Sequence, residues 1–100
     1  EMTRTLYEAL GTETSKRAFV HYPAGAYPGQ KQDFADNTHF NPYGAYQIAK
    51  CVIEGMKKAV PNLAKHLKID PTYNPAYPDN PDTFHWNNSP FTEIEKPDGN

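Results

Sequence analysis

The chain is organised around the stretch DNTHFNPYGA, residues 36–45. It places an aspartate, Asp36, three residues before a histidine, His39, and a helix follows. Asn41 suits the N-cap because its side-chain oxygen can accept a hydrogen bond from a first-turn N–H, and Pro42 suits the next position because its φ is already helical. We therefore expect Asp36 and His39 to lie in a short loop that is fixed to a rigid helix.

The Asp36–His39 pair has the chemistry of two members of a catalytic triad. An aspartate can accept a hydrogen bond from Nδ1–H of a histidine, which fixes the tautomer, stabilises the imidazolium and leaves Nε2 to take a proton from a nucleophile. The same spacing also arises by chance, and an Asp–His pair before a helix is often only a capping arrangement. On these residues alone both interpretations stay open.

A longer match favours the catalytic interpretation. The segments LYEALGTETSK, residues 6–16, and DNTHFNPYGAYQIAKCVIEGMK, residues 36–57, resemble the C-terminal part of SGNH (GDSL-type) esterases. The most similar branch is the rhamnogalacturonan acetylesterase-like one. The resemblance implies that Asp36 and His39 are the triad aspartate and histidine. It also implies an α/β fold, as the C-terminal portion of a three-layer α/β/α, flavodoxin-like hydrolase.

The resemblance implies an activity of which this chain would supply only a part. In such esterases the serine comes from a Gly-Asp-Ser element near the N-terminus, and its backbone, a Gly and an Asn donate to the oxyanion. None of those blocks occurs in these residues, and Ser15 and Ser89 lack that context. We therefore expect the C-terminal portion of a larger serine esterase, with the remainder of the hydrolase domain as its partner. By itself the chain should be inactive.

The implied substrate is an acetylated cell-wall polysaccharide such as rhamnogalacturonan, from which the enzyme would remove O-acetyl groups. The resemblance implies no cofactor and no metal, and a secreted or periplasmic location. A non-catalytic carbohydrate-binding or interaction module is the alternative, favoured by the aromatic C-terminal part and the missing serine. An esterase fold that has lost its activity is a third interpretation.

Composition argues against several classes of function. A net charge of −2 gives no electrostatic footprint for nucleic acid or an anionic membrane. No apolar run approaches the roughly 18 residues that a membrane span needs, and the start of the chain does not read as a signal peptide. The histidines are spaced unlike zinc ligands. The single cysteine, Cys51, excludes an internal disulfide and is expected to be a small core residue.

The sequence of residues 1–22 predicts one helix, followed by a stretch whose structure is ambiguous. Apolar residues at helical spacing predict a helix from about Met2 to Leu10 that Gly11 ends in a left-handed conformation. A polar connection over residues 12–16 should follow. Residues 17–22, RAFVHY, have the β-branched and aromatic content of a strand. The resemblance instead places the last four of them in an extended piece of loop outside the central sheet.

Residues 23–35 combine turn residues with aromatic rings and predict an ordered surface loop that leads into the site. Tyr22, Tyr27 or Phe34 could form a platform for a sugar ring, and Lys31 could pair with a uronate carboxylate. The rings could also serve only to pin an irregular loop to the protein, which is the simpler interpretation of any one of them.

The helix that follows Asn41 should be long and amphipathic. Its apolar face carries Ala45, Ile48, Ala49, Val52, Ile53, Met56, Ala59 and Val60. Its polar face carries Gln47, Lys50, Glu54, Lys57 and Lys58. We expect the apolar face to lie on a sheet, which implies a partner outside this chain. After Pro61, residues 63–68 should add a helical turn or two.

The last part of the chain changes character at residue 70. Residues 70–100 contain six prolines, too closely spaced for a helix or a central strand. Their aromatic residues, unusual in a solvated tail, are Tyr73, Tyr77, Phe84, Trp86 and Phe91. We predict an extended arm that docks its rings on another surface, with Pro-rich disorder as the alternative. The chain thus divides into residues 1–69, the hydrolase segment with the Asp-x-x-His element, and the arm.

Overall fold

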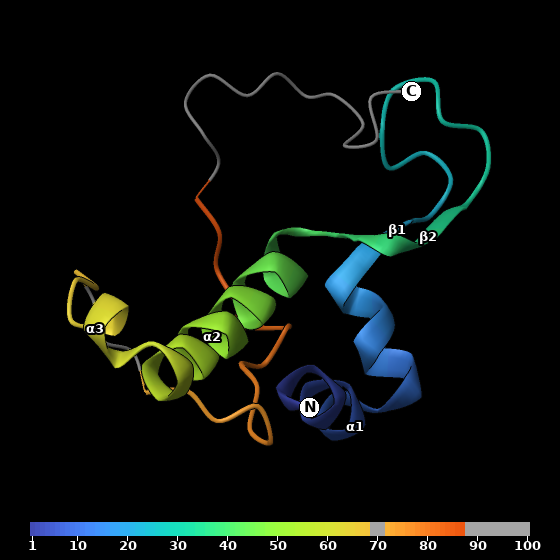
Figure 1. The fold of residues 1–100 in the computed structure, drawn as a ribbon. Coiled ribbons are helices and arrows are strands. Elements are labelled where there is room, and N and C mark those ends of the chain that lie inside the picture. The colour runs from blue at the N-terminus through green and yellow to red at the C-terminus, as the bar shows by residue number, and fades with distance from the viewer. Residues whose placement is uncertain (69–71, 88–100) are drawn as a thin grey trace.

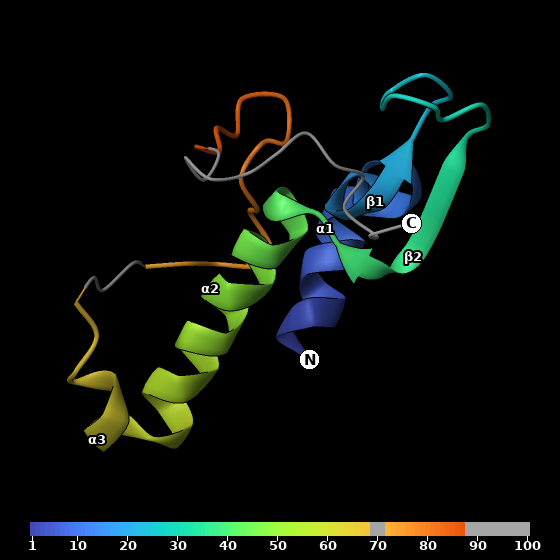
Figure 2. The same ribbon diagram turned by 90° about the horizontal axis from the view of Figure 1, so that it is seen from above.

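Helices and a two-stranded sheet make up the structure of this chain (Figure 1). A computed structural model describes residues 1–68 and 72–87. The elements are α1 (Met2–Ser15), a 3-10 helix η1 (Lys16–Ala18), β1 (Phe19–Tyr22), β2 (Phe34–Phe40), α2 (Pro42–Ala59) and α3 (Pro61–Ala64). Helices α1 and α2 lie side by side, and the loop between the strands extends away from both helices (Figures 1 and 2). This content is consistent with the α/β class.

Gly11 breaks α1 where the sequence predicted, but helical structure resumes after it. Its φ of 75° and ψ of 171° lie outside the helical region, in a conformation that glycine reaches easily because it has no Cβ. The polar connection expected over residues 12–16 is instead helical up to Ser15 and then continues into η1. An ion pair of 2.8 Å between Lys16 and Glu13 supports this extra turn.

The two strands correct the expectation of an irregular loop. Residues 19–22 form β1, as their composition indicated, and not the extended loop that the resemblance implied. Residues 34–40, expected as loop, form β2, which pairs antiparallel with β1. Aromatic pairs close both ends of the sheet, with ring centroids 6.2 Å apart at Tyr22 and Phe34. Cross-strand pairs of this kind stabilise a sheet.

Asn41 caps α2, as predicted, and also ties the helix to the preceding segment. Its Oδ1 accepts a hydrogen bond from the backbone N–H of Gly44 at 2.9 Å. Its Nδ2 donates to the carbonyl oxygens of Arg17 at 2.6 Å and Phe19 at 3.0 Å. Gly44 lies so close to η1 that a Cβ on it would be 2.0 Å from the carbonyl oxygen of Ala18. The first turn of α2 is therefore held firmly against η1 and β1.

The core of the described residues is small and lies where α1, η1, β1 and α2 meet. Its buried members are Leu6, Ala18, Val20, Tyr43, Gln47 and Cys51. The burial of Cys51 is as expected for a small core residue. Burial also raises the pKa of its thiol, so the residue is not an activated nucleophile.

Within this chain, helix α2 buries the face that the sequence analysis assigned as polar. Its buried residues include Gln47, which was assigned to the polar face and is 0% exposed. The predicted apolar face is open at Ala45, Ala49 and Val52, and Val52 is 63% exposed. The reason is that the arm and α1 cover the opposite side of the helix. Within the described ranges the predicted apolar face has no sheet to lie on.

The described part of the arm, residues 72–87, runs along α2 (Figure 1). The Phe84 ring contacts two aromatic rings of α2: its centroid lies 5.4 Å from that of Tyr43 and 5.5 Å from that of Tyr46. Trp86 follows at 5.4 Å from Tyr46. The surface that these rings dock on is therefore a helix of the same chain. Phe91 lies outside the described residues, and the division of the chain at residue 70 stays a prediction.

A polar group of side chains, which we call the Gln47 cluster, fastens the arm to α2. It consists of Gln47, Lys50, Tyr73 and Asp79. Gln47 donates through Nε2 to Asp79 Oδ2 at 2.8 Å, and its Oε1 accepts from the Tyr73 hydroxyl at 2.8 Å and from the backbone N–H of Asp79 at 3.3 Å. Lys50 forms an ion pair with the same Asp79 carboxylate. Because both its amide nitrogen and its amide oxygen have hydrogen-bond partners, Gln47 is buried without the free-energy cost of an unpaired polar group.

Among the described residues beyond α2 there is one short further helix. α3 begins at Pro61 and ends at Ala64, so the turns predicted over residues 63–68 start earlier and end sooner than expected. No helix in the described part of the chain is long and apolar enough to cross a membrane.

Candidate active site

Asp36 and His39 lie on β2, in a strand and not in the short loop that the sequence predicted. Their side chains nevertheless meet as expected. Nδ1 of His39 donates a hydrogen bond to Oδ2 of Asp36 at 2.6 Å. Because an ionised carboxylate can only accept, this contact fixes the proton on Nδ1 and leaves Nε2 of the neutral imidazole as an acceptor.

The backbone of β2 curls around the Asp36 carboxylate. Oδ1 of Asp36 accepts hydrogen bonds from the backbone N–H groups of Thr38 at 2.6 Å and His39 at 3.0 Å. An aspartate that binds the backbone two residues ahead forms a local turn, which departs from regular strand geometry. This turn brings a side chain three residues along the strand back toward the carboxylate. Local chemistry therefore sets the geometry of the pair.

The surroundings of Asp36 favour its ionised form. Its pKa is lowered from 3.8 to about 2, first by the hydrogen bond with the His39 side chain and then by the two backbone N–H groups. Asp36 therefore carries its negative charge at all but strongly acidic pH. A fixed charge next to Nδ1 stabilises the imidazolium that forms when Nε2 takes up a proton.

The two side chains of the pair differ in exposure. The Asp36 side chain is 18% exposed, whereas that of His39 is 75% exposed. The carboxylate is thus shielded on one side of the imidazole, and the other side of the ring is open. Among the described residues nothing hydrogen-bonds to Nε2 of His39. The open nitrogen is the atom that a general base would use.

His21 makes a contact next to this pair that the sequence did not indicate. Asn37, which follows Asp36, accepts a hydrogen bond from Nε2 of His21 through its Oδ1 at 2.6 Å. The contact joins β1 to the segment that carries the carboxylate. It follows from the register, which pairs His21 with Ala35. The register could be found only if β2 were recognised as a strand.

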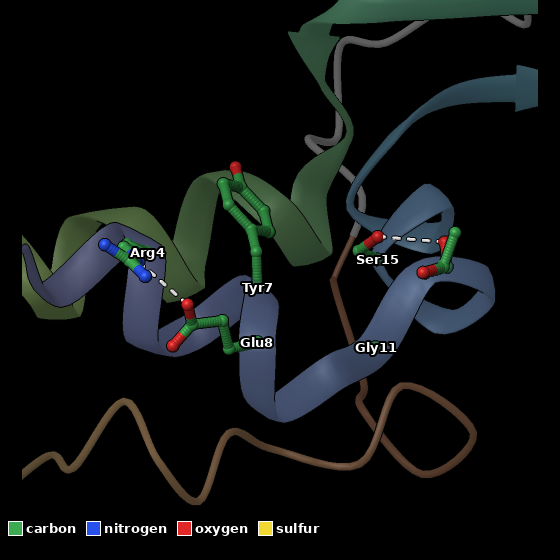
Figure 3. A pocket seen from close by; sticks show the side chains of 6 residues that line it. Arg4, Tyr7, Glu8, Gly11 and Ser15 are labelled. Atoms are coloured by element: carbon green, nitrogen blue, oxygen red, sulfur yellow. Dashed lines mark hydrogen bonds and ion pairs between the residues drawn. The ribbon is translucent and has the colours of Figure 1, made fainter.

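Ser15 is not brought to the pair. Figure 3 shows a depression along one side of α1, lined by Arg4, Tyr7, Glu8, Gly11, Thr12 and Ser15. Neither Asp36 nor His39 lines this depression. The Ser15 hydroxyl donates to the carbonyl oxygen of Thr12 at 3.1 Å, within its own helical turn. Ser89, the other serine of the chain, lies outside the described residues.

The described residues contain no group of three or more histidine, cysteine, aspartate or glutamate side chains that could hold a metal ion. Nε2 of His85 donates a hydrogen bond to Oδ1 of a near neighbour, Asn87, at 2.9 Å. His66 lies exposed just beyond α3.

An acid–base pair of this kind is found in hydrolases, and comparison with known proteins agrees with that class. The chain is 43% identical over 65 residues to the rhamnogalacturonan acetylesterase RhgT of Bacillus subtilis (strain 168). The match covers 65% of this chain and 28% of the relative, so the chain spans well under half of that protein. No protein-family model matches, and no solved structure matches significantly. The resemblance of the sequence to a rhamnogalacturonan acetylesterase-like esterase is thus confirmed.

Proposed function

We propose that this chain supplies the aspartate and histidine of a serine esterase that removes O-acetyl groups from a cell-wall polysaccharide such as rhamnogalacturonan. The observation that carries the proposal is the 2.6 Å hydrogen bond from His39 Nδ1 to Asp36 Oδ2. It occurs in a chain that is 43% identical over 65 residues to an acetylesterase. The nucleophilic serine and the oxyanion donors would come from the remainder of a three-layer α/β/α hydrolase domain, in a secreted or periplasmic protein.

In the proposed reaction His39 moves the protons. Its Nε2 takes the proton of the serine hydroxyl as that oxygen attacks the acetyl carbonyl, and then gives the proton to the sugar oxygen as the ester bond breaks. Water then attacks the acetyl-serine with the same histidine as base, and acetate leaves. Asp36 stays ionised and stabilises the imidazolium in both steps. The low pKa of Asp36 supports this role because the carboxylate does not take up the proton itself.

The test is the substitution His39→Ala in the complete protein, assayed with an aryl acetate. Loss of a general base costs about a hundredfold or more in rate, so the variant should be nearly inactive. His66→Ala is a matched control because His66 is also exposed but lies beyond α3. A His39→Ala variant that turns over at the parent rate would show that the histidine has no role in the reaction.

Exposed aromatic rings favour a second candidate, a non-catalytic carbohydrate-binding module. Tyr46 is 45% exposed, Trp86 42% and Tyr77 80%. A serine-directed fluorophosphonate probe separates the two functions, because only an activated serine reacts with it. Labelling of the complete protein that depends on His39 supports the esterase. Absence of labelling supports a binding module or an inactive esterase fold.

A further inference from the structure

A bulge in β2 begins directly after Asp36 and contains His39. The strand register passes from Phe40 to Asp36 on β2 while β1 advances by a single residue. Residues 37–39 therefore lie between two paired positions and have no partner position on β1. A bulge bends a strand and re-aims its side chains, and bulges are common beside active sites. The direction in which His39 points thus depends on what holds this bulge.

Asp36 holds the bulge from one face of the sheet. Asp36 is paired with Val20, and side chains of paired residues in antiparallel strands project to the same face. Val20 is 3% exposed, so this is the face that packs on the core. From there Oδ1 of Asp36 accepts hydrogen bonds from the backbone N–H groups of Thr38 and His39. These bonds fix the second and third residues of the bulge.

His21 holds the first residue of the bulge from the other face. Successive side chains of a strand point to opposite faces, so Asn37 projects away from Asp36 and toward the face that carries the paired residues His21 and Ala35. There Nε2 of His21 donates a hydrogen bond to Oδ1 of Asn37 at 2.6 Å, since an amide oxygen can only accept. The bond ties the bulge to a regularly paired position of β1.

The ring of His39 depends on the bulge for its position. Its side chain is 75% exposed, and among the described residues its ring hydrogen-bonds only to Asp36. Without that bond the proton of the neutral imidazole can lie on either nitrogen. A ring with its proton on Nε2 has no acceptor for the proton of a serine hydroxyl. Misplacement of a catalytic group by about 1 Å can cost about a hundredfold in rate.

We propose that His21 is a positioning residue of the esterase, which acts through Asn37 to hold the bulge that keeps Nδ1 of His39 on Asp36. This inference rests on the proposed esterase function, but the position of the proton on His39 can be measured without hydrolysis. His21 also lines a concavity of about 320 Å³ together with Asn41. Direct contact of His21 with a bound substrate is therefore the alternative that the experiment separates.

The first measurement is the tautomer of His39 in the complete protein, read from the nitrogen chemical shifts of its ring at a pH at which the imidazole is neutral. The parent protein should carry the proton on Nδ1. His21→Ala and Asn37→Ala should each move part of it to Nε2, because the bulge is released. His21→Gln should retain the parent signal, since the glutamine amide can donate to Asn37. Asn37 is exposed, so its substitution leaves the core unchanged.

The second measurement is hydrolysis of an aryl acetate by the same variants. His21→Ala should lower kcat about fivefold, the order of one hydrogen bond, and should leave KM unchanged. Asn37→Ala should have the same effect, and the double variant should lose no more than either single one, because both remove the same bond. His85→Ala is the matched control. Nε2 of His85 also donates to an asparagine, Asn87, but in the arm, so this variant should change neither quantity.

Three kinetic or spectroscopic results would overturn the inference. They are an unchanged His39 tautomer in Asn37→Ala, additive losses of kcat in the double variant, and a His21→Ala variant whose KM rises at constant kcat. The last of these would mean that His21 contacts the substrate. An equal effect of His85→Ala would also contradict a role specific to the bulge.

The positioning role and the esterase function can fail separately. A protein whose His39 tautomer depends on His21, but whose hydrolysis does not depend on His39, would disprove the esterase function alone. A protein that hydrolyses the aryl acetate through His39, with a tautomer that does not depend on His21, would disprove the positioning role alone.

Discussion

The Asp36–His39 pair and the Gln47 cluster are both hydrogen-bonded polar groups, but they differ in what surrounds them. The His39 side chain is 75% exposed, whereas Gln47 is fully buried. In the pair, one imidazole nitrogen is held and the other is open. In the cluster, the amide of Gln47 has partners on both its oxygen and its nitrogen. The first arrangement suits proton transfer, and the second suits the attachment of one chain segment to another.

The pKa values of the ionisable groups at the two sites are shifted by different surroundings. Hydrogen bonds to His39 and the backbone hold the pKa of Asp36 at about 2. Burial acts to raise the pKa of Asp79, but the hydrogen bonds from Lys50 and Gln47 outweigh it and lower that pKa below its ordinary value. Burial raises the pKa of the Tyr73 hydroxyl well above its usual range, so this group remains a donor. Both carboxylates are held in their ionised form, Asp36 by a histidine side chain and two backbone N–H groups, and Asp79 by Lys50 and Gln47.

The largest expected effect concerns activity at the pair. Asp36→Asn in the complete protein should lower kcat for an aryl acetate about a hundredfold or more, because the amide is neutral and cannot stabilise the imidazolium. Unfolding temperature should change little, because Oδ1 of the asparagine can still accept from the backbone N–H groups of Thr38 and His39. Asp82→Asn, which removes a surface ion pair with Arg17, is the control and should leave kcat unchanged. Equal kcat values for Asp36→Asn and Asp82→Asn would show that the Asp36 carboxylate has no special role in the reaction.

The next effect concerns stability at the Gln47 cluster. Gln47→Ala should lower the free energy of unfolding by about 3 kcal/mol, because it leaves a cavity and removes the partner of the Tyr73 hydroxyl. Turnover of the aryl acetate per folded molecule should stay the same. Urea unfolding of the complete protein measures the first quantity. A loss below about 0.5 kcal/mol, the range of ordinary surface substitutions, would show that the cluster does not hold the arm.

A smaller effect is expected at the edge of the same cluster. The ion pair between Lys50 and Asp79 is partly open to solvent, with side chains 26% and 41% exposed. Solvent screens such a pair, so Lys50→Met should lower the free energy of unfolding by at most about 1 kcal/mol. The same urea experiment applies. If Lys50→Met costs as much as Gln47→Ala, the charge and not the buried amide fastens the arm.

The smallest effect is a change in titration and sharpens the comparison at the pair. The pKa of Asp36 is lower in the folded chain than its ordinary 3.8. Its contribution to stability is therefore complete above pH 3.8 and is lost as the pH falls toward 2. The carboxyl carbon signal of Asp36 should titrate with a midpoint near 2, and His39→Ala should raise that midpoint toward the ordinary value. If the midpoint in the His39→Ala protein stays at the value of the parent protein, the backbone N–H groups alone account for the low pKa of Asp36.

Features encoded by a few neighbouring residues could be read from the sequence. The start of α2 follows from Asn41 and Pro42, and the break in α1 follows from Gly11, because each acts on its own backbone. The contact between Asp36 and His39 also depends only on local chain geometry. These predictions did not need the position of any distant segment.

Features that depend on distant partners could not be predicted. β2 was missed because Asp36 and Asn37 are poor strand formers. The strand is also supported by a contact between the rings of Tyr22 and Phe34, which lie on opposite sides of a long loop. The buried face of α2 was missed because the partners of Gln47 come from positions 26 and 32 residues away. A glutamine with no visible partner is correctly assigned to a polar face. The arm changes that assignment by supplying the partners.

The side chain of Asn41 limits which residues can replace it. Asparagine and aspartate are usually interchangeable as helix caps, since both accept from a first-turn N–H. Here Nδ2 must also donate to the carbonyl oxygens of Arg17 and Phe19. A carboxylate would set its negative oxygens against both of them. Among the common capping residues only the amide therefore fits, and a substitution scan at position 41 should separate the two roles, with Asn41→Asp keeping the cap while losing the bridge.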